Sequence, residues 1–342
     1  MTTDSSRAGF EFAVRFIRAQ NDRALFASAT TALAELVKID ADHQPPAVKP
    51  TADLIPLAFI SAGSFLMGSP DDEPGRSKTE GPRHEVTLAA FWMAKTPITQ
   101  AQWRTVASWP RVERDLDLDP SHFKGDNRPV EQVSWHDAME FCHRLSQRTG
   151  KNYTLPSEAQ WEYACRAGTT TPFHFEPTIS TEVANYDGNY IYDQGSKGIY
   201  RKQTIDVASF PANGWGLHDM HGNVWEWCLD EWHDSYDGAP TDGSAWGDHS
   251  LGEPLAADCC VAGRGSTAPG SAARPTASTT ARTSASSTSV SASVASDASY
   301  RLLRGGSWVL SSRFCRSACR KDAFPGYRSY DIGFRVCFLP QD

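Results

Sequence analysis

Apolar residues recur at helical spacing near the N-terminus. Phe10, Val14 and Ile17 share one face of a helix over residues 9–38, so residues 1–38 are expected to form an N-terminal helical segment. Residues 39–56 contain several prolines and are typical of a linker. The main domain is therefore expected over residues 57–338.

The pattern inside this domain predicts both strands and helices. The alternating stretch FISAGSFLMGS at 59–69 predicts a strand, a turn and a second strand. Three helices are predicted by capping boxes, in which a hydroxyl residue and the residue three positions later cap the same helix end. The boxes are Thr99 with Gln102, Ser134 with Asp137, and Ser157 with Gln160, and the last two helices are expected to end at Gly150 and Gly168. After residue 170, Gly, Asn, Asp and aromatic residues indicate long structured loops, with short strands in GNVWEWC (222–228) and at the C-terminus.

Composition narrows the class of protein. The chain has 342 residues, of which 40% are hydrophobic, enough for one large or two ordinary domains. A net charge of -8 argues against a nucleic-acid partner, which would favour a basic surface. No apolar run reaches the length of a membrane span, and no export signal is visible, so a cytoplasmic location is expected by default and surface display is the alternative. The eight scattered cysteines form no paired CxxC pattern and are expected to be reduced, mostly buried thiols.

Six motifs occur in order along most of the chain after residue 60. They are GSFLMGS (63–69), PVEQVSWHDAMEFCHRLS (129–146), YTLPSEAQWEYACRAG (153–168), WGLHDMHGNVWEWC (215–228), LRGGSW (303–308) and GFRV (333–336). Together they resemble the formylglycine-generating-enzyme-like (sulfatase-modifying factor) family. The resemblance implies an α+β domain of the C-type-lectin type, with much irregular structure and many buried tryptophans.

The family's enzymes oxidise a substrate cysteine with copper and a pair of active cysteines between the RGGS and GFR motifs. Counted back from Pro325, the positions of that pair are occupied by Ser312 and Ser317. Hydroxyls are hard, weak ligands for Cu(I), which prefers thiolates, so we expect no copper site and no catalytic residue. The alternative is an active oxidase of the family with a copper site at the nearby Cys315 and Cys319.

Calcium is a second cofactor that the resemblance implies, near HDMHGNVWE (218–226). The implied ligands are side-chain oxygens of Asp219 and Glu226, the carbonyls of Gly222 and Val224, and Asn185 for a second site. Calcium prefers such oxygen ligands. A turn that carries surface acids is the alternative interpretation.

Residues 301–337 also resemble the variable region of proteins that diversity-generating retroelements mutate. Such proteins place a lectin-type fold behind a set of variable surface residues, and the mutagenesis of template adenines produces NNC codons. Between the fixed motifs GGSW, CRSA and IGFRV, every candidate ligand-binding residue is of a type that an NNC codon can encode, whereas Lys321 is not and is assigned to the scaffold. These candidates are Val309, Leu310, Ser311, Phe314, Cys319, Asp322, Ala323, Phe324, Gly326, Tyr327, Ser329, Tyr330 and Asp331.

This set mixes rigid aromatic anchors with small polar side chains, as antibody paratopes do. Phe314 and Cys319 have packing as their alternative role, and the arginines of this region are expected to form scaffold ion pairs. The functional prediction is a non-catalytic binding protein whose partner is an unidentified protein or surface ligand.

A low-complexity segment supplies an independent indication. If Leu302–Trp308 is written with the codons CTG CTG CGT GGC GGG TCG TGG and read one base late, it becomes CCVAGRG, which is the sequence of residues 259–265. The correspondence continues without a gap from Asp258 to Val294, at a constant offset of 43 residues. Shifted NNC codons give Ser, Thr, Ala and Pro, which explains the composition. We therefore interpret residues 258–299 as a disordered insertion that contains an out-of-frame copy of the variable cassette, and a plain disordered linker is the alternative.

Overall fold

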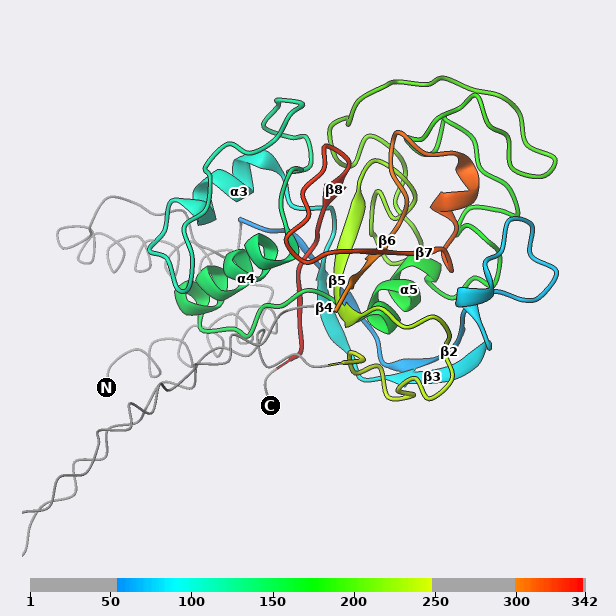
Figure 1. The fold of residues 1–342 in the computed structure, drawn as a ribbon, viewed down its shortest axis with the longest axis horizontal. Coiled ribbons are helices and arrows are strands. Elements are labelled where there is room, and N and C mark those ends of the chain that lie inside the picture. Colours follow the sequence, from blue (N-terminus) through cyan, green and yellow to red (C-terminus); the bar gives the residue numbers. More distant parts are fainter. Residues whose placement is uncertain (1–53, 248–298, 341–342) are drawn as a thin grey trace, which may run out of the picture. The chain divides into compact units, whose positions relative to one another are not determined.

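The computed structural model describes residues 54–247 and 299–340 (Figure 1). The predicted N-terminal helices, most of the linker and the insertion at 258–299 lie outside the described residues. What remains is a mixed α+β arrangement of three α-helices, three small sheets and long loops.

The three predicted helices are confirmed, together with their capping boxes. Helix α3 spans Gln100–Ala107, α4 spans Trp135–Thr149 and α5 spans Glu158–Arg166. In each case the N-cap hydroxyl accepts a hydrogen bond from the third helical residue, which caps the N-cap backbone in return. Helix α4 stops at Gly150, whose left-handed conformation (φ 71°) favours glycine.

The strands form three sheets. The first contains β1 (Leu57–Ile60), β4 (Phe91–Ala94) and β9 (Cys337–Phe338), and the second contains β2 (Gly63–Met67) and β3 (His84–Leu88). The third has the order β7-β6-β5-β8, with β5 at Trp225–Glu231, β6 at Arg301–Arg304, β7 at Arg320–Ala323 and β8 at Ile332–Gly333. Short 3-10 turns occur at η2 (Lys78–Glu80) and η3 (Ser312–Cys315). The two strands predicted within 59–69 exist, but they belong to different sheets, because β1 pairs with β4 and β2 pairs with β3.

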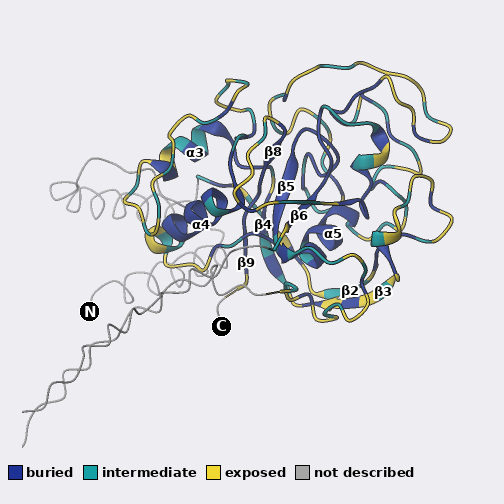
Figure 2. Cartoon of the chain, viewed as in Figure 1, coloured by how far each residue is buried: buried dark blue, intermediate teal, exposed yellow. Residues whose placement is uncertain are grey.

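Buried tryptophans hold this irregular backbone. Trp103, Trp135 and Trp161 are almost fully buried, and each indole N–H donates a hydrogen bond. The Trp103 indole donates to the Asp117 carbonyl (2.8 Å) and the Trp135 indole to the Cys228 carbonyl (2.9 Å). The Trp161 indole donates to the Glu226 carboxylate (2.8 Å). A buried indole that finds an acceptor avoids the cost of an unpaired donor. Figure 2 shows that β5, α5 and much of the loop backbone beside them are buried, whereas the exposed stretches lie mainly on the outer loops.

A buried ion network fixes the third sheet against α5. Arg304 on β6 contacts the carboxylates of Glu158 and Glu162 on α5, and Arg320 on β7 binds Glu158 through Nε (2.8 Å) and Nη2 (2.8 Å). All four side chains are buried. Removal of one partner would leave a buried charge uncompensated, so this network specifies how the C-terminal segment seats on the domain.

Candidate functional surface

The C-terminal segment separates into buried and exposed positions on one rigid backbone. Its fixed arginines point inward: Arg316 binds Glu73 (2.6 Å) and Glu80 (2.7 Å), and Arg335 binds Glu226 through two bonds of 2.6 and 2.7 Å. Arg313 and Arg328 are the exceptions, since both are exposed. The expected ion-pair role therefore holds for the buried arginines and also for Arg328, whose guanidinium binds the Asp137 carboxylate from the surface (2.8 and 3.0 Å).

The most exposed candidate positions lie on the loop after β7. Phe324 and Tyr327 are each 53% exposed and Tyr330 is 42% exposed. Gly326 is also exposed, and a Cβ placed there would meet no heavy atom within 4 Å, so the backbone has room for other side chains. The half-buried candidates are Val309, Leu310, Ser311, Phe314, Asp322, Ala323 and Ser329.

Two candidate positions do not reach the surface. The Cys319 side chain is 4% exposed and belongs to the main apolar core, and its burial raises the thiol pKa to about 12. The Asp331 carboxylate is buried as well and accepts hydrogen bonds from the hydroxyls of Ser307 (2.8 Å) and Ser329 (2.5 Å). In this conformation neither side chain is placed to touch a ligand. Asp331 acts on the surface indirectly, because it orients Ser329.

Residues outside the C-terminal segment complete the exposed face. The Asp187 N–H donates to the Leu310 carbonyl (2.9 Å), and the Ser312 hydroxyl donates to the Tyr190 carbonyl (3.2 Å). The loop between α5 and β5 therefore lies beside the segment around η3 (Figure 1). This loop exposes Tyr190, Ile191 and Ile199.

An aromatic cluster connects the two parts. The Trp308 ring lies 5.5 Å from Tyr330, 6.2 Å from Tyr200 and 5.3 Å from Phe123 (centroid distances). Sequence reasoning missed the loop residues in this face. The aromatic-rich composition after residue 170 was the available signal, but the sequence does not reveal which loop lies next to the variable positions.

The positions assigned to the oxidase cysteines are buried and carry hydroxyls. Ser312 is hydrogen-bonded to Tyr190, as described above, and the Ser317 hydroxyl accepts a weak hydrogen bond from the Cys165 thiol (3.6 Å). Burial raises the pKa of the Cys165 thiol to about 12 and also raises that of Cys315. Cu(I) prefers thiolate ligands, so the hydroxyls at Ser312 and Ser317 do not supply the ligands that a copper site needs. The six cysteines in the described ranges are free and buried, as expected.

The residues implied for calcium do not form one oxygen cage. Both Glu226 oxygens bind Arg335, and one also accepts from the Trp161 indole, so its charge is already offset. One Asp219 oxygen accepts from the Ala208 N–H (2.7 Å), and burial raises the Asp219 pKa to about 6. Asn185 and Gly222 are neighbours in an isolated parallel bridge, and the Asn185 Oδ1 is buried without a partner among the described residues.

The observed arrangement therefore does not bring all the implied calcium ligands, which also include the Val224 carbonyl, around one site. Calcium binding stays a prediction, which a comparison of Tm in CaCl2 and in EDTA would test. Within the described ranges, no group of three or more His, Cys, Asp or Glu side chains is placed to hold a metal ion. None of the helices in these ranges is both long and apolar enough to cross a membrane.

Glu131 lies behind the exposed face. Its Oε1 accepts from the Phe123 N–H (2.7 Å), whereas Oε2 is buried and has no hydrogen-bond partner among the described residues. Burial raises the Glu131 pKa to about 7, and the negative charge of Asp331 adds to this effect. The charge at the variable position Asp331 therefore influences the titration of Glu131 in the fixed part of the domain.

Comparison with known proteins places these features in a family. A model described as the sulfatase-modifying factor enzyme 1-like domain matches residues 44–338. The formylglycine-generating enzyme of Mycobacterium tuberculosis is 27% identical over 354 residues, which cover 84% of this chain and 99% of that protein. The enzyme of Thermomonospora curvata is 37% identical over 224 residues, which cover 52% of this chain and 71% of that protein.

Two solved structures share the fold. PvdO from Pseudomonas aeruginosa superposes with a TM-score of 0.62 at 30% identity, covering 87% of this chain and 99% of that one. Treponema denticola variable protein 1 superposes with a TM-score of 0.57 at 24% identity, covering 83% and 95%. The expected α+β fold of the C-type-lectin type is thereby confirmed. The chain belongs to the sulfatase-modifying factor enzyme 1-like domain family.

Proposed function

We propose that this protein is a non-catalytic binding protein whose C-terminal segment displays a surface that a retroelement diversifies. The observation that carries the proposal is the separation of positions within residues 301–337. The positions expected to stay fixed supply the buried ion pairs, whereas eleven of the thirteen positions expected to vary are exposed or half-buried. A protein organised in this way can change its surface without changing its core.

The chemistry of the exposed face favours a macromolecular partner. Phe324, Tyr327 and Tyr330 are rigid aromatic side chains, which supply contact area at a low cost in conformational entropy. Tyr190, Ile191 and Ile199 extend the apolar part of the face from the fixed loop. Such exposed anchors are typical of the hot spots of protein interfaces. The likeness to the Treponema variable protein supports a fold that can display such a surface.

The formylglycine-generating enzymes among the relatives make an oxidase the competing function. The protein should be titrated anaerobically with Cu(I) and then incubated with a peptide that carries a sulfatase cysteine motif. The binding-protein proposal expects neither stoichiometric copper binding nor formylglycine. Formation of formylglycine, together with copper binding that is lost in C315S/C319S, would establish the oxidase instead.

The retroelement part of the proposal is tested by the gene. At the thirteen candidate positions we expect codons that end in C, and we expect the nucleotides that encode residues 258–294 to match those of the adjacent cassette. A reverse-transcriptase gene nearby is a further expectation. Other third bases at these codons would sink the diversification proposal, whereas the copper experiment decides the enzymatic alternative independently.

A further inference from the structure

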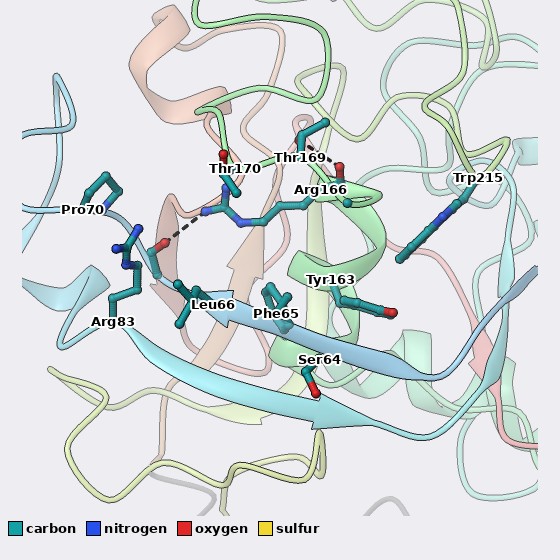
Figure 3. Close-up of a pocket in the computed structure, with 12 residues that line it drawn as sticks. Ser64, Phe65, Leu66, Pro70, Arg83, Tyr163, Arg166, Thr169, Thr170 and Trp215 are labelled. Atoms are coloured by element: carbon teal, nitrogen blue, oxygen red, sulfur yellow. Dashed lines mark hydrogen bonds between the residues drawn. The ribbon is translucent and has the colours of Figure 1, made fainter.

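A cavity of about 250 Å³ lies between β2 and the C-terminal end of α5 (Figure 3). None of its lining residues belongs to the segment 301–337, so the cavity is formed by the fixed part of the domain. Its walls come instead from β2 and the segment that connects β2 to β3, from the end of α5, and from the loop at Trp215.

One end of the cavity is aromatic. The Tyr163 ring packs against Phe65 at a centroid distance of 5.3 Å and against Trp215 at 4.7 Å. The Tyr163 hydroxyl donates to the Ser61 carbonyl (3.2 Å), which fixes the central ring of the three. Trp215 is only half-buried, and its indole N–H has no hydrogen-bond partner in the described ranges. Tyr163 is itself almost fully buried, so the half-exposed indole of Trp215 offers most of the aromatic surface on which a flat ring can pack.

The other end is cationic. Arg166 is held rigidly, since its guanidinium donates to Glu162 Oε1 (2.9 Å), to the Gly68 carbonyl (3.0 Å) and to the Thr171 carbonyl (3.1 Å). Arg83 is exposed and makes no hydrogen bond or ion pair with any described residue. Figure 3 shows both guanidinium groups toward the Pro70 end of the cavity, and Trp215 at the opposite end.

The charge balance of the walls favours an anion. The lining residues include two arginines and no carboxylate. Glu162, which pairs with Arg166, divides its charge between Arg166 and Arg304. Arg83 is therefore a cation without a counterion, on the rim of a cavity whose other polar groups include the hydroxyls of Thr169 and Thr170. A guanidinium in this position matches the geometry of a carboxylate.

We propose that this cavity binds a small aromatic carboxylate, with its ring against Tyr163 and Trp215 and its anionic group at Arg83. The volume suits one or two fused rings. This site is independent of the function proposed above, because no variable side chain contributes to it.

Binding can be tested on the full chain with 1-naphthoate as the probe, by saturation-transfer NMR and isothermal titration calorimetry. Neutral 1-naphthalenemethanol and non-aromatic cyclohexanecarboxylate serve as matched probes. We expect each of these two to bind at least about tenfold more weakly than 1-naphthoate, because each lacks one of the two interactions. The variant R83Q should weaken 1-naphthoate binding about fivefold or more, and W215L should weaken it as well.

The controls locate the site. R111Q removes another exposed arginine and should leave the affinity unchanged, as should Y327S/Y330S on the variable face. Equal affinity of R83Q and R111Q, or the absence of 1-naphthoate binding up to about 10 mM, would overturn the proposal. Loss of binding in Y327S/Y330S would place the ring on the variable face and would overturn it too.

Discussion

The arginines of the C-terminal segment illustrate how burial sets the role of one residue type. Arg335 is fully buried against Glu226, with its remaining N–H groups donating to the carbonyls of Ala94 (3.1 Å) and His218 (2.9 Å). Arg313 is exposed and lies with its guanidinium carbon 4.6 Å from the centre of the Phe314 ring. The first geometry supports the fold, and the second leaves the cation at the surface.

The ion pair of Arg335 gives the first prediction. In R335M the Glu226 carboxylate loses its charged partner inside the core, so the free energy of unfolding should fall by about 3–5 kcal/mol. R111M is the matched control, because Arg111 and Asp115 form an exposed pair and its loss should cost less than about 1 kcal/mol. Urea unfolding followed by tryptophan fluorescence measures both. Equal losses in the two variants would contradict the scaffold role of Arg335.

Glu131 gives a prediction about pH. Its pKa is raised to about 7 in the folded protein, so between its ordinary value and pH 7 the folded state holds a proton that the unfolded state has released. This carboxyl therefore lowers stability as the pH rises through that window. E131Q should be more stable than the parent at pH 8, by about 1 kcal/mol or more, and the difference should shrink toward pH 4. Tm measured at both pH values decides this, and a pH-independent difference would refute it.

At the scale of elements, local signals could be predicted from the sequence and distant pairings could not. The capping boxes at Thr99, Ser134 and Ser157 lie within four residues of chain, so the helices could be located correctly. The alternation at 59–69 indicated two strands, but their separation into two sheets depends on partners far along the chain, since Leu57 pairs with Ala94 and Gly63 pairs with Leu88. Long loops carry no periodic signal, which is why Tyr190 and Ile199 were not assigned to the exposed face.

The capping box of α4 is open to a direct test. The Ser134 hydroxyl accepts from the Asp137 N–H (3.2 Å), and Asp137 in turn accepts from the Ser134 N–H (2.9 Å) and from Arg328 of the variable loop (2.8 Å). S134A should therefore lower the free energy of unfolding by about 1 kcal/mol. In the control T105A, an exposed position inside α3, we expect a change below about 0.5 kcal/mol. Thermal unfolding of the two variants should separate them, and a smaller effect of S134A than of T105A would argue against the cap.

For the whole molecule, the segment that forms the candidate surface could be predicted from the sequence, but the burial of its individual positions could not. Codon logic selected positions by their coding potential, which is blind to burial, so it included Cys319 in the core and Asp331 beneath Ser329. The same logic excluded Lys321 because no lysine codon ends in C, although the Lys321 side chain is exposed. Whether a side chain is exposed depends on the packing of β6 and β7 against α5, and the set of available codons says nothing about that packing.

A display surface requires that its exposed positions be energetically separate from the core, and this gives the last prediction. Phe324 and Tyr327 are each about half exposed, and among the aromatic rings in the described ranges Phe324 contacts only Tyr300, at a centroid distance of 4.2 Å. F324S/Y327S should therefore change the free energy of unfolding by less than about 1 kcal/mol. F334A removes a fully buried ring three residues after the variable loop and should cost about 3–5 kcal/mol. Urea unfolding of both variants tests the separation: if the surface pair costs as much as F334A, the variable positions support the fold and cannot vary freely.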